Sequence, residues 1–157
     1  MSEGSERVER AVSRFKKGFS CSQALVSAYG PDFGLEDEYA LRISSPFAGG
    51  IGNMGETCGA VTGALMVLGL LTGKAGVEDE KTIEEIQRTV KRFIEEFKAR
   101  NGSVTCRELL GCDISTGRGM AEAQLKGLFH RRCPMFVRDA AEIIEKLLEA
   151  GEKGERA

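Results

Sequence analysis

Residues 58–71 read CGAVTGALMVLGLL, and this stretch decides the fold. From Ala60 onward its apolar side chains cover nearly every side of the helix that the pattern predicts. A helix that is apolar all round is buried on most of its surface. The run falls short of the about 20 residues that a membrane span needs. We therefore expect a central, buried helix in a soluble domain.

The segments on either side of this helix also have helical periodicity. Apolar residues recur at three- and four-residue spacing, and glycine or proline stands at several ends. The expected helices cover residues 8–15, 21–29, 35–43, 78–100, 105–110 and 134–148, with 120–128 as a further candidate. No alternating strand pattern, repeat or linker stands out. The sequence thus predicts one all-α domain over residues 1–157. We expect a compact bundle of about six to seven helices with a frayed tail at 151–157.

Composition restricts the kind of protein. The chain has 157 residues, a formal net charge of −2 and five cysteines. With a pI near 5.6, no basic stripe argues for nucleic-acid binding. The polar N-terminus does not resemble a signal peptide, and no membrane segment is expected, so we predict a cytoplasmic protein. In that compartment, cysteines bind metal or take part in redox chemistry more often than they form structural disulfides.

Four of the five cysteines stand where a predicted helix begins. Cys21 follows Ser20 and Cys106 follows Thr105, and each pair has Gln or Glu at the position expected for a capping box. Cys58 opens the central helix, and Cys133 precedes a proline, which is favoured in a first helical turn. A helix N-terminus favours a thiolate over a thiol. The shared placement therefore indicates a metal centre or reactive thiols.

Cysteine spacing narrows the kinds of metal site. No two of the four cysteines form the C-x2-C pair of zinc knuckles, and ferredoxin-type loops are also absent. A site would have to be assembled from four separate helix starts. His130 lies three residues before Cys133 and is a candidate base, proton relay or ligand. Cys112 lacks the helix-start context and is either incidental or a resolving thiol for Cys106.

A glycine-rich loop precedes Cys58. Residues 50–55 match the G-x-G-x-x-G dinucleotide pattern, but the stretch before them is a poor strand, so a nucleotide site is disfavoured. Glycine lets the backbone pass close to a bulky group or take a positive φ. We therefore interpret the loop as wrapping a cluster or a reactive sulfur. The candidate cofactor-binding residues are Gly52, Gly55 and Gly59.

The four cysteine segments together resemble a prokaryotic family of redox-active proteins labelled by the signature Cys, Gly-Cys-Ala-x-x-Gly, Cys, Cys. The matching segments are 18–24, 55–63, 106–111 and 133–137, and the similarity spans residues 5–148. Here the second motif has Cys58 before Gly59, whereas the label has glycine first. The resemblance implies redox activity through Cys21, Cys58, Cys106 and Cys133. A similar module in split-Soret-type cytochromes implies an iron–sulfur centre, although this chain lacks the C-x-x-C-H haem motif.

Three hypotheses follow. The first is electron transfer through an iron–sulfur cluster, with a [2Fe–2S] form preferred, held by Cys21, Cys58, Cys106 and Cys133. The second is a thiol–disulfide oxidoreductase in which Cys21 or Cys58 attacks. The third is a structural zinc site, or a helical interaction module without metal. In each redox case a partner protein of unknown identity is needed, and the apolar surface makes a homodimer a reasonable expectation.

Overall fold

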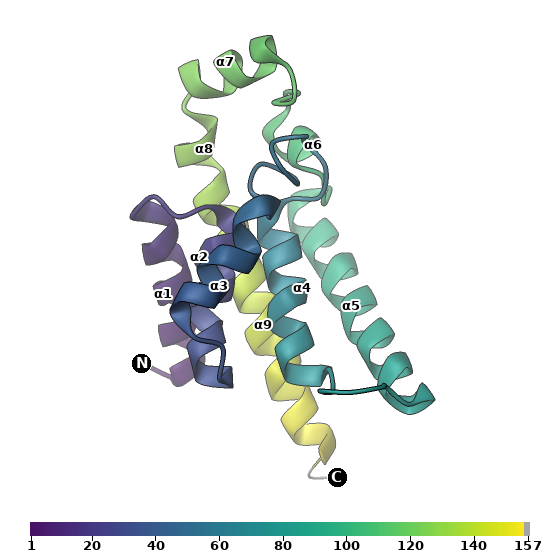
Figure 1. The fold of residues 1–157 in the computed structure, drawn as a ribbon. Coiled ribbons are helices and arrows are strands. Elements are labelled where there is room, and N and C mark those ends of the chain that lie inside the picture. The colour runs from purple at the N-terminus through teal and green to yellow at the C-terminus, as the bar shows by residue number, and fades with distance from the viewer. Residues whose placement is uncertain (156–157) are drawn as a thin grey trace.

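The computed structural model describes residues 1–155, with side chains to Gly151. These residues form nine α-helices and two 3-10 helices (Figure 1). In chain order they are α1 Glu3–Lys16, α2 Cys21–Tyr29, η1 Gly30–Phe33, α3 Asp37–Ser44, η2 Ser45–Phe47, α4 Gly59–Thr72, α5 Glu80–Asn101, α6 Cys106–Leu110, α7 Gly117–Leu125, α8 Leu128–Arg131 and α9 Cys133–Glu155. The all-α prediction is confirmed.

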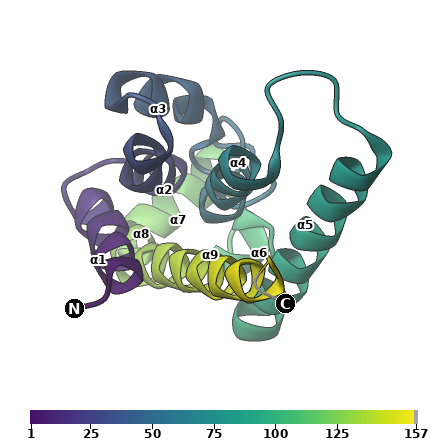
Figure 2. The same cartoon turned by 90° about the horizontal axis from the view of Figure 1, so that it is seen from below.

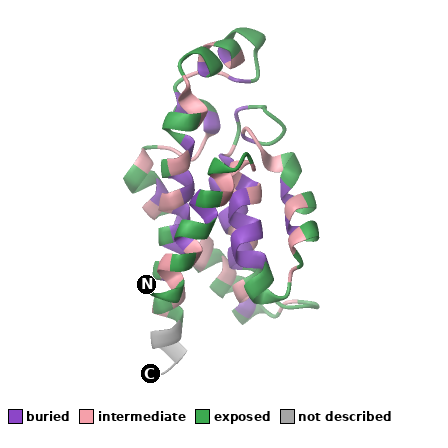
Figure 3. Ribbon diagram, turned by 90° about the vertical axis from the view of Figure 1, so that its left-hand side faces the viewer, coloured by how far each residue is buried: buried purple, intermediate pink, exposed green. Residues whose placement is uncertain are grey.

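The long helices form two layers. Helix α9 lies between α1 and α5, and the pair α2 and α4 packs against the inner side of α9 (Figures 1 and 2). Helix α3 covers α2 from outside. Buried residues concentrate where the long helices face one another, and the arm that holds α7 is mostly exposed (Figure 3). The predicted central helix is α4, whose buried side chains include Val61 and Val67.

Local sequence explains where the helices begin and end. Ser2 caps α1 and Asp79 caps α5, each accepting a hydrogen bond from a backbone N–H three residues on. Gly102 ends α5 with a φ of 86°, which glycine adopts without strain.

The helix count exceeds the prediction because the segments after α5 divide into short helices. The last helix continues to Glu155 rather than ending near residue 148, and residues 156 and 157 lie outside the described part.

A part-buried polar network joins the two layers. Arg7 of α1 donates from Nε and Nη2 to the Glu145 carboxylate of α9, at 2.9 and 3.0 Å. The Tyr29 hydroxyl of α2 donates to the same carboxylate at 2.8 Å. The side chains of Arg7 and Glu145 are only 12% and 13% exposed. Because partly buried charges need partners, this network fixes how α1, α2 and α9 align.

Helix α5 is buried unevenly along its length. Phe93 and Phe97 are fully buried, with ring centroids 6.0 Å apart. Ile83, near the start of the helix, is 41% exposed. The large apolar side chains of α5 are thus fully buried only in its C-terminal half, which is the half near the cysteines. Among residues 1–155, no helix is both long and apolar enough to cross a membrane.

Candidate thiol site

The four cysteines occupy the helix starts that the sequence predicts. Cys21, Cys106 and Cys133 are the first residues of α2, α6 and α9, and Cys58 is the N-cap of α4. Cys58, Cys106 and Cys133 are buried, and Cys21 is partly exposed. Ser20 and its partner Gln23 form a full capping box at α2. At α6 the capping-box prediction is wrong, because the Thr105 side chain makes no capping hydrogen bond.

Helices α2 and α4 meet through two glycines. A Cβ added at Gly59 would lie 3.1 Å from Ser22 N and 3.2 Å from Cys21 Cβ. A Cβ at Gly63, one turn further, would lie 3.0 Å from Ser22 Cα. Since carbon atoms pack best at about 3.5–4.0 Å, only glycine allows this approach. The close crossing brings Cys21 beside Cys58.

A short backbone pairing places Cys106 on the same side as Cys58. Thr57 and Thr105 form an isolated antiparallel bridge. The Cys58 N–H donates to Val104 O at 2.8 Å, and the Cys106 N–H donates to Glu56 O at 2.6 Å. Each cysteine follows its bridged threonine by one residue, and successive residues of extended backbone face opposite ways. Both cysteines therefore leave the pairing on the face opposite the threonines.

An arginine joins the start of α9 to α6. Arg132 directly precedes Cys133, and its Nη1 donates to Leu109 O at 2.8 Å. Leu109 lies in the helix that Cys106 opens. A cationic donor at the C-terminal end of a helix also suits the helix dipole. Arg132 is thus a positioning residue that links the segments carrying Cys106 and Cys133.

All four cysteines line one cavity of about 380 Å³. Its wall is drawn from seven helices and the loops between them. The apolar part includes four phenylalanines, two leucines and a methionine, namely Phe15, Phe19, Phe129, Phe136, Leu109, Leu110 and Met120. The polar part includes Lys16, Ser20, Asn53 and His130. The fold therefore gathers the dispersed cysteines into one largely apolar chamber.

The glycine-rich loop forms part of this chamber in an unusual conformation. Gly49, Gly50, Ile51, Gly52 and Asn53 have φ values of 64°, 71°, 61°, 60° and 61°. Such a φ is a genuine outlier for β-branched Ile51, and strain of this kind clusters at functional sites. A Cβ at Gly50 would lie 2.7 Å from Cys106 Cβ. The loop thus closes directly over Cys106.

One of the three glycines selected from the sequence lines the chamber, and two others of the glycine-rich loop that were not selected also line it. Gly59 lines it, as do Gly49 and Gly50. Gly52 is exposed, and Gly55 packs against the Arg107 side chain, so neither is part of the wall. Their residue type follows from positive φ values of 60° and 70°. Motif position alone does not distinguish glycines needed for a turn from glycines needed for a close approach.

The thiols have opposed proton affinities. The pKa of Cys58 is lowered, first by a hydrogen bond from the Cys21 thiol and then by the backbone N–H groups of Ala60 and Val61, which outweigh its burial. The pKa of Cys21 is raised well above its ordinary value, first by its hydrogen bonds with Cys133 and Cys58 and then by burial. Burial raises the pKa of Cys106 to about 12. Among Cys21, Cys58 and Cys106, Cys58 is therefore the one whose surroundings favour the thiolate.

The two residues left undecided by the sequence differ in position. His130 lies in α8, is exposed and lines the chamber. Cys112 is partly buried and lies outside the chamber wall. All five cysteines are free thiols. Within the described residues, no three His, Cys, Asp or Glu side chains already stand in an arrangement that holds a single metal ion.

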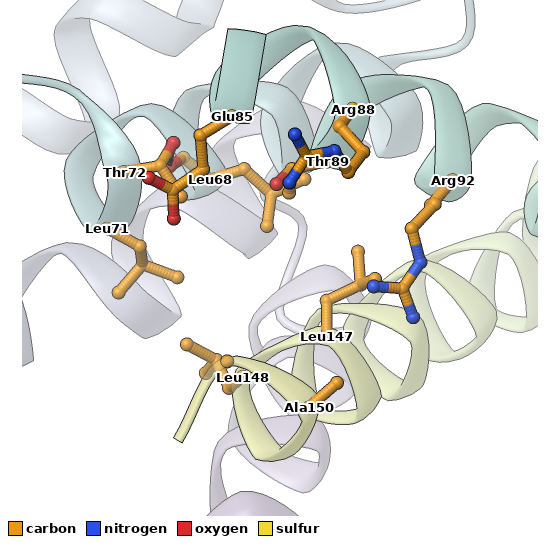
Figure 4. Close-up of a pocket in the computed structure, with 11 residues that line it drawn as sticks. Leu68, Leu71, Thr72, Glu85, Arg88, Thr89, Arg92, Leu147, Leu148 and Ala150 are labelled. Atoms are coloured by element: carbon orange, nitrogen blue, oxygen red, sulfur yellow. Dashed lines mark hydrogen bonds between the residues drawn. The ribbon is translucent and has the colours of Figure 1, made fainter. Parts of the chain in front are cut away.

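A second groove lies between α4, α5 and α9. It is about 430 Å³ in volume and contains no cysteine (Figure 4). Arg88 and Arg92 of α5 face Leu147 and Leu148 of α9 across it (Figure 4). None of the predicted site residues lies there, so this groove is separate from the thiol chamber.

Comparison with known proteins agrees with the cysteine geometry. Residues 19–147 match the family model described as "Putative redox-active protein (C_GCAxxG_C_C)". No curated protein and no solved structure matches the chain. The matched range covers well over half of the sequence and contains Cys21, Cys58, Cys106 and Cys133. The chain that gathers these four cysteines into one chamber therefore belongs to the C_GCAxxG_C_C family of redox-active proteins.

Proposed function

We propose that this protein transfers electrons through an iron–sulfur cluster held by Cys21, Cys58, Cys106 and Cys133. The observation that carries the proposal is that all four cysteines line one chamber, each at a helix start. A binuclear cluster is preferred over a cubane. When bound, such a cluster accepts and donates one electron at a time.

The donor set fits a cluster in its chemistry. Cysteine thiolates are the usual ligands of iron–sulfur clusters. The chamber has room for more than one ion, since about 380 Å³ lies between the four thiol-bearing segments and the aromatic wall. The phenylalanines on this wall limit access of water to the sulfurs. Solvent exposure and hydrogen bonds to sulfur are two of the features that set a cluster potential.

Each cysteine would take part as a thiolate, so its proton must leave. The pKa of Cys58 is lowered by the hydrogen bond from Cys21 and by N–H donors from the first turn of α4, which favours its thiolate. Cys21 and Cys106 hold their protons more tightly than an ordinary thiol. The N-termini of α2, α4 and α9 offset part of the negative charge that four thiolates create. Cluster assembly should therefore release protons and favour higher pH.

The test is anaerobic reconstitution with iron and sulfide, followed by metal and sulfide analysis and a visible spectrum. We expect near-equal iron and sulfide with a brown chromophore. Cys58→Ser should lose the chromophore, while Cys112→Ser, whose side chain lies outside the chamber, should keep it. A protein that stays colourless would refute the cluster, and stoichiometric zinc resistant to reductants would favour a structural zinc site instead.

A second function is favoured by the contact between Cys21 and Cys58. The Cys58 thiolate would attack a substrate disulfide, forming a mixed disulfide and releasing one substrate thiolate. Cys21 would then lose its proton and attack Cys58, releasing the second substrate thiol and leaving a Cys21–Cys58 disulfide. This requires a thiol pKa well below about 8.5 and a reversible disulfide, both measurable on metal-free protein by alkylation and mass spectrometry.

A further inference from the structure

The mouth of the chamber can be located from the exposure of its wall. Most of the lining residues are buried or partly buried. The exposed ones are Lys16, Gly18, Asn53 and His130, which come from the end of α1 and the residues after it, the glycine-rich loop and α8. Electrons or substrates that reach the sulfurs must therefore cross the surface around these residues.

The segments that form the chamber are basic although the whole chain is acidic. We define the cavity end as segments 14–20, 45–58 and 102–133, which supply most of the chamber wall. It contains eight basic and four acidic residues, a net charge of +4, whereas the whole chain carries −2. The rest of the protein therefore carries −6. A charge asymmetry of this size orients the molecule toward an acidic partner during encounter.

Three basic side chains at or beside the mouth form no ion pair with the described residues. Lys16 lines the mouth, Lys17 follows it, and Arg131 follows His130. All three are exposed, and among the described residues none has a carboxylate oxygen within 4.0 Å. By contrast, Arg7 and Arg138, away from the mouth, each pair with a glutamate. These three cationic side chains are therefore available to carboxylates of a partner.

Exposed apolar side chains beside the mouth indicate a protein partner rather than a small anion. Asn53 lines the chamber, and its neighbours Ile51 and Met54 are 41% and 57% exposed. The backbone of Ile51 holds a positive φ of 61°, which is costly for a β-branched residue. Exposed apolar groups within a charged rim are characteristic of protein interfaces, in which methionine is enriched.

We propose that the mouth of the chamber is the docking surface for an acidic redox protein. Lys16, Lys17 and Arg131 would attract its carboxylates, and Ile51 and Met54 would pack against its surface. This inference rests on the proposed redox function, because it supplies the partner that exchanges electrons with the thiol chamber. It names a class of partner, an acidic electron-carrier protein, and the face that receives it.

Binding can be tested with a plant-type ferredoxin, a strongly acidic electron carrier, titrated calorimetrically in its oxidised form. We expect binding at an ionic strength of about 10 mM, where charges act over about 30 Å, and its loss at about 1 M. Lys16→Glu/Arg131→Glu should weaken binding about tenfold or more. The matched control Lys81→Glu/Lys98→Glu makes the same charge change on α5 and should stay within about twofold of the unaltered protein.

Three outcomes would overturn the proposal: no ferredoxin binding at low salt, equal losses in both double variants, or tighter binding of basic cytochrome c than of ferredoxin. Ile51→Ser/Met54→Ser offers a second check, with weaker binding expected at the low ionic strength. The titrations are performed on metal-free and on reconstituted protein. Failure to take up iron would then refute the cluster alone, since docking is measured without it.

Discussion

Gly63→Ala should destabilise the protein, although the same change usually strengthens a helix. The added Cβ would lie 3.0 Å from both Ser22 Cα and Ser22 O, and 3.3 Å from Leu25 Cβ. The two Ser22 distances are about 0.5 Å shorter than a relaxed carbon contact, and the Leu25 distance is about 0.2 Å shorter. Both Ser22 atoms belong to the backbone of α2 and cannot rotate away. Helices α2 and α4 must therefore separate.

The size of the effect follows from two opposing contributions. Overpacking of a well-packed contact costs about 1–3 kcal/mol. Replacing glycine by alanine within a helix recovers about 0.5–1 kcal/mol. The net loss expected for Gly63→Ala is therefore about 1 kcal/mol. Gly69→Ala is the matched control, because Gly69 lies in the same helix with no atom within 4 Å of its added Cβ. That variant should gain stability.

Urea denaturation of the metal-free protein measures both variants. The difference between them, about 1–3 kcal/mol, isolates the steric contribution because both changes share the gain in helix propensity. Gly59→Ala tests the same helix contact at the thiol site, because its added Cβ would lie 3.2 Å from Cys21 Cβ. Separation of Cys21 from Cys58 should raise the Cys58 pKa toward its ordinary value. Equal stabilisation by Gly63→Ala and Gly69→Ala would refute the close crossing.

Three other changes test separate parts of the structure. Glu145→Ala should lower the free energy of unfolding, measured by urea denaturation, by about 3 kcal/mol, because it leaves the part-buried Arg7 and Tyr29 without their shared partner. A loss below about 1 kcal/mol would contradict the network. Arg132→Gln should lower the free energy of unfolding by about 1 kcal/mol and speed cysteine alkylation, because the hydrogen bond to α6 is lost. An unchanged alkylation rate would contradict a positioning role for Arg132. For Cys106, the folded pKa of about 12 lies above an ordinary value near 9. Its contribution to stability is complete below pH 9 and is lost as the pH rises to 12, so Cys106→Ser should flatten that decline in metal-free protein.

The sequence predicts helices best where local chemistry determines the backbone. Ser20 and Gln23 form the expected capping box, since both partners lie within one helical turn. At Thr105 the same pattern fails. The backbone there pairs with Thr57, and Glu108 instead accepts a hydrogen bond from Ser103. A long-range contact that the pattern does not encode decides which local option is used.

The chamber itself depends on contacts that a one-dimensional pattern does not show. The prediction that glycines permit a close approach is appropriate for Gly59, but Gly49 and Gly50 also line the chamber, unlike Gly52 and Gly55. The run of positive φ values includes Ile51, a residue that propensity would never assign to that conformation. Such a loop exists because surrounding structure imposes it, so it is visible only after folding.

The protonation pattern of the chamber bears on both candidate functions. Four adjacent thiolates in a largely apolar site would repel one another, and the pKa is lowered only at Cys58 among the three thiols whose pKa is shifted in the chamber. The pKa of Cys21 is raised by its hydrogen bonds with Cys133 and Cys58 and then by burial, and the pKa of Cys106 is raised by burial and then by neighbouring sulfur. A disulfide mechanism uses this pattern directly, with one thiol biased toward the thiolate and one adjacent thiol that holds its proton more tightly. A cluster instead requires the retained protons to leave, so its assembly must depend steeply on pH, whereas attack by Cys58 need not. The pH dependence of iron uptake and of Cys58 alkylation therefore separates two functions that share one set of residues.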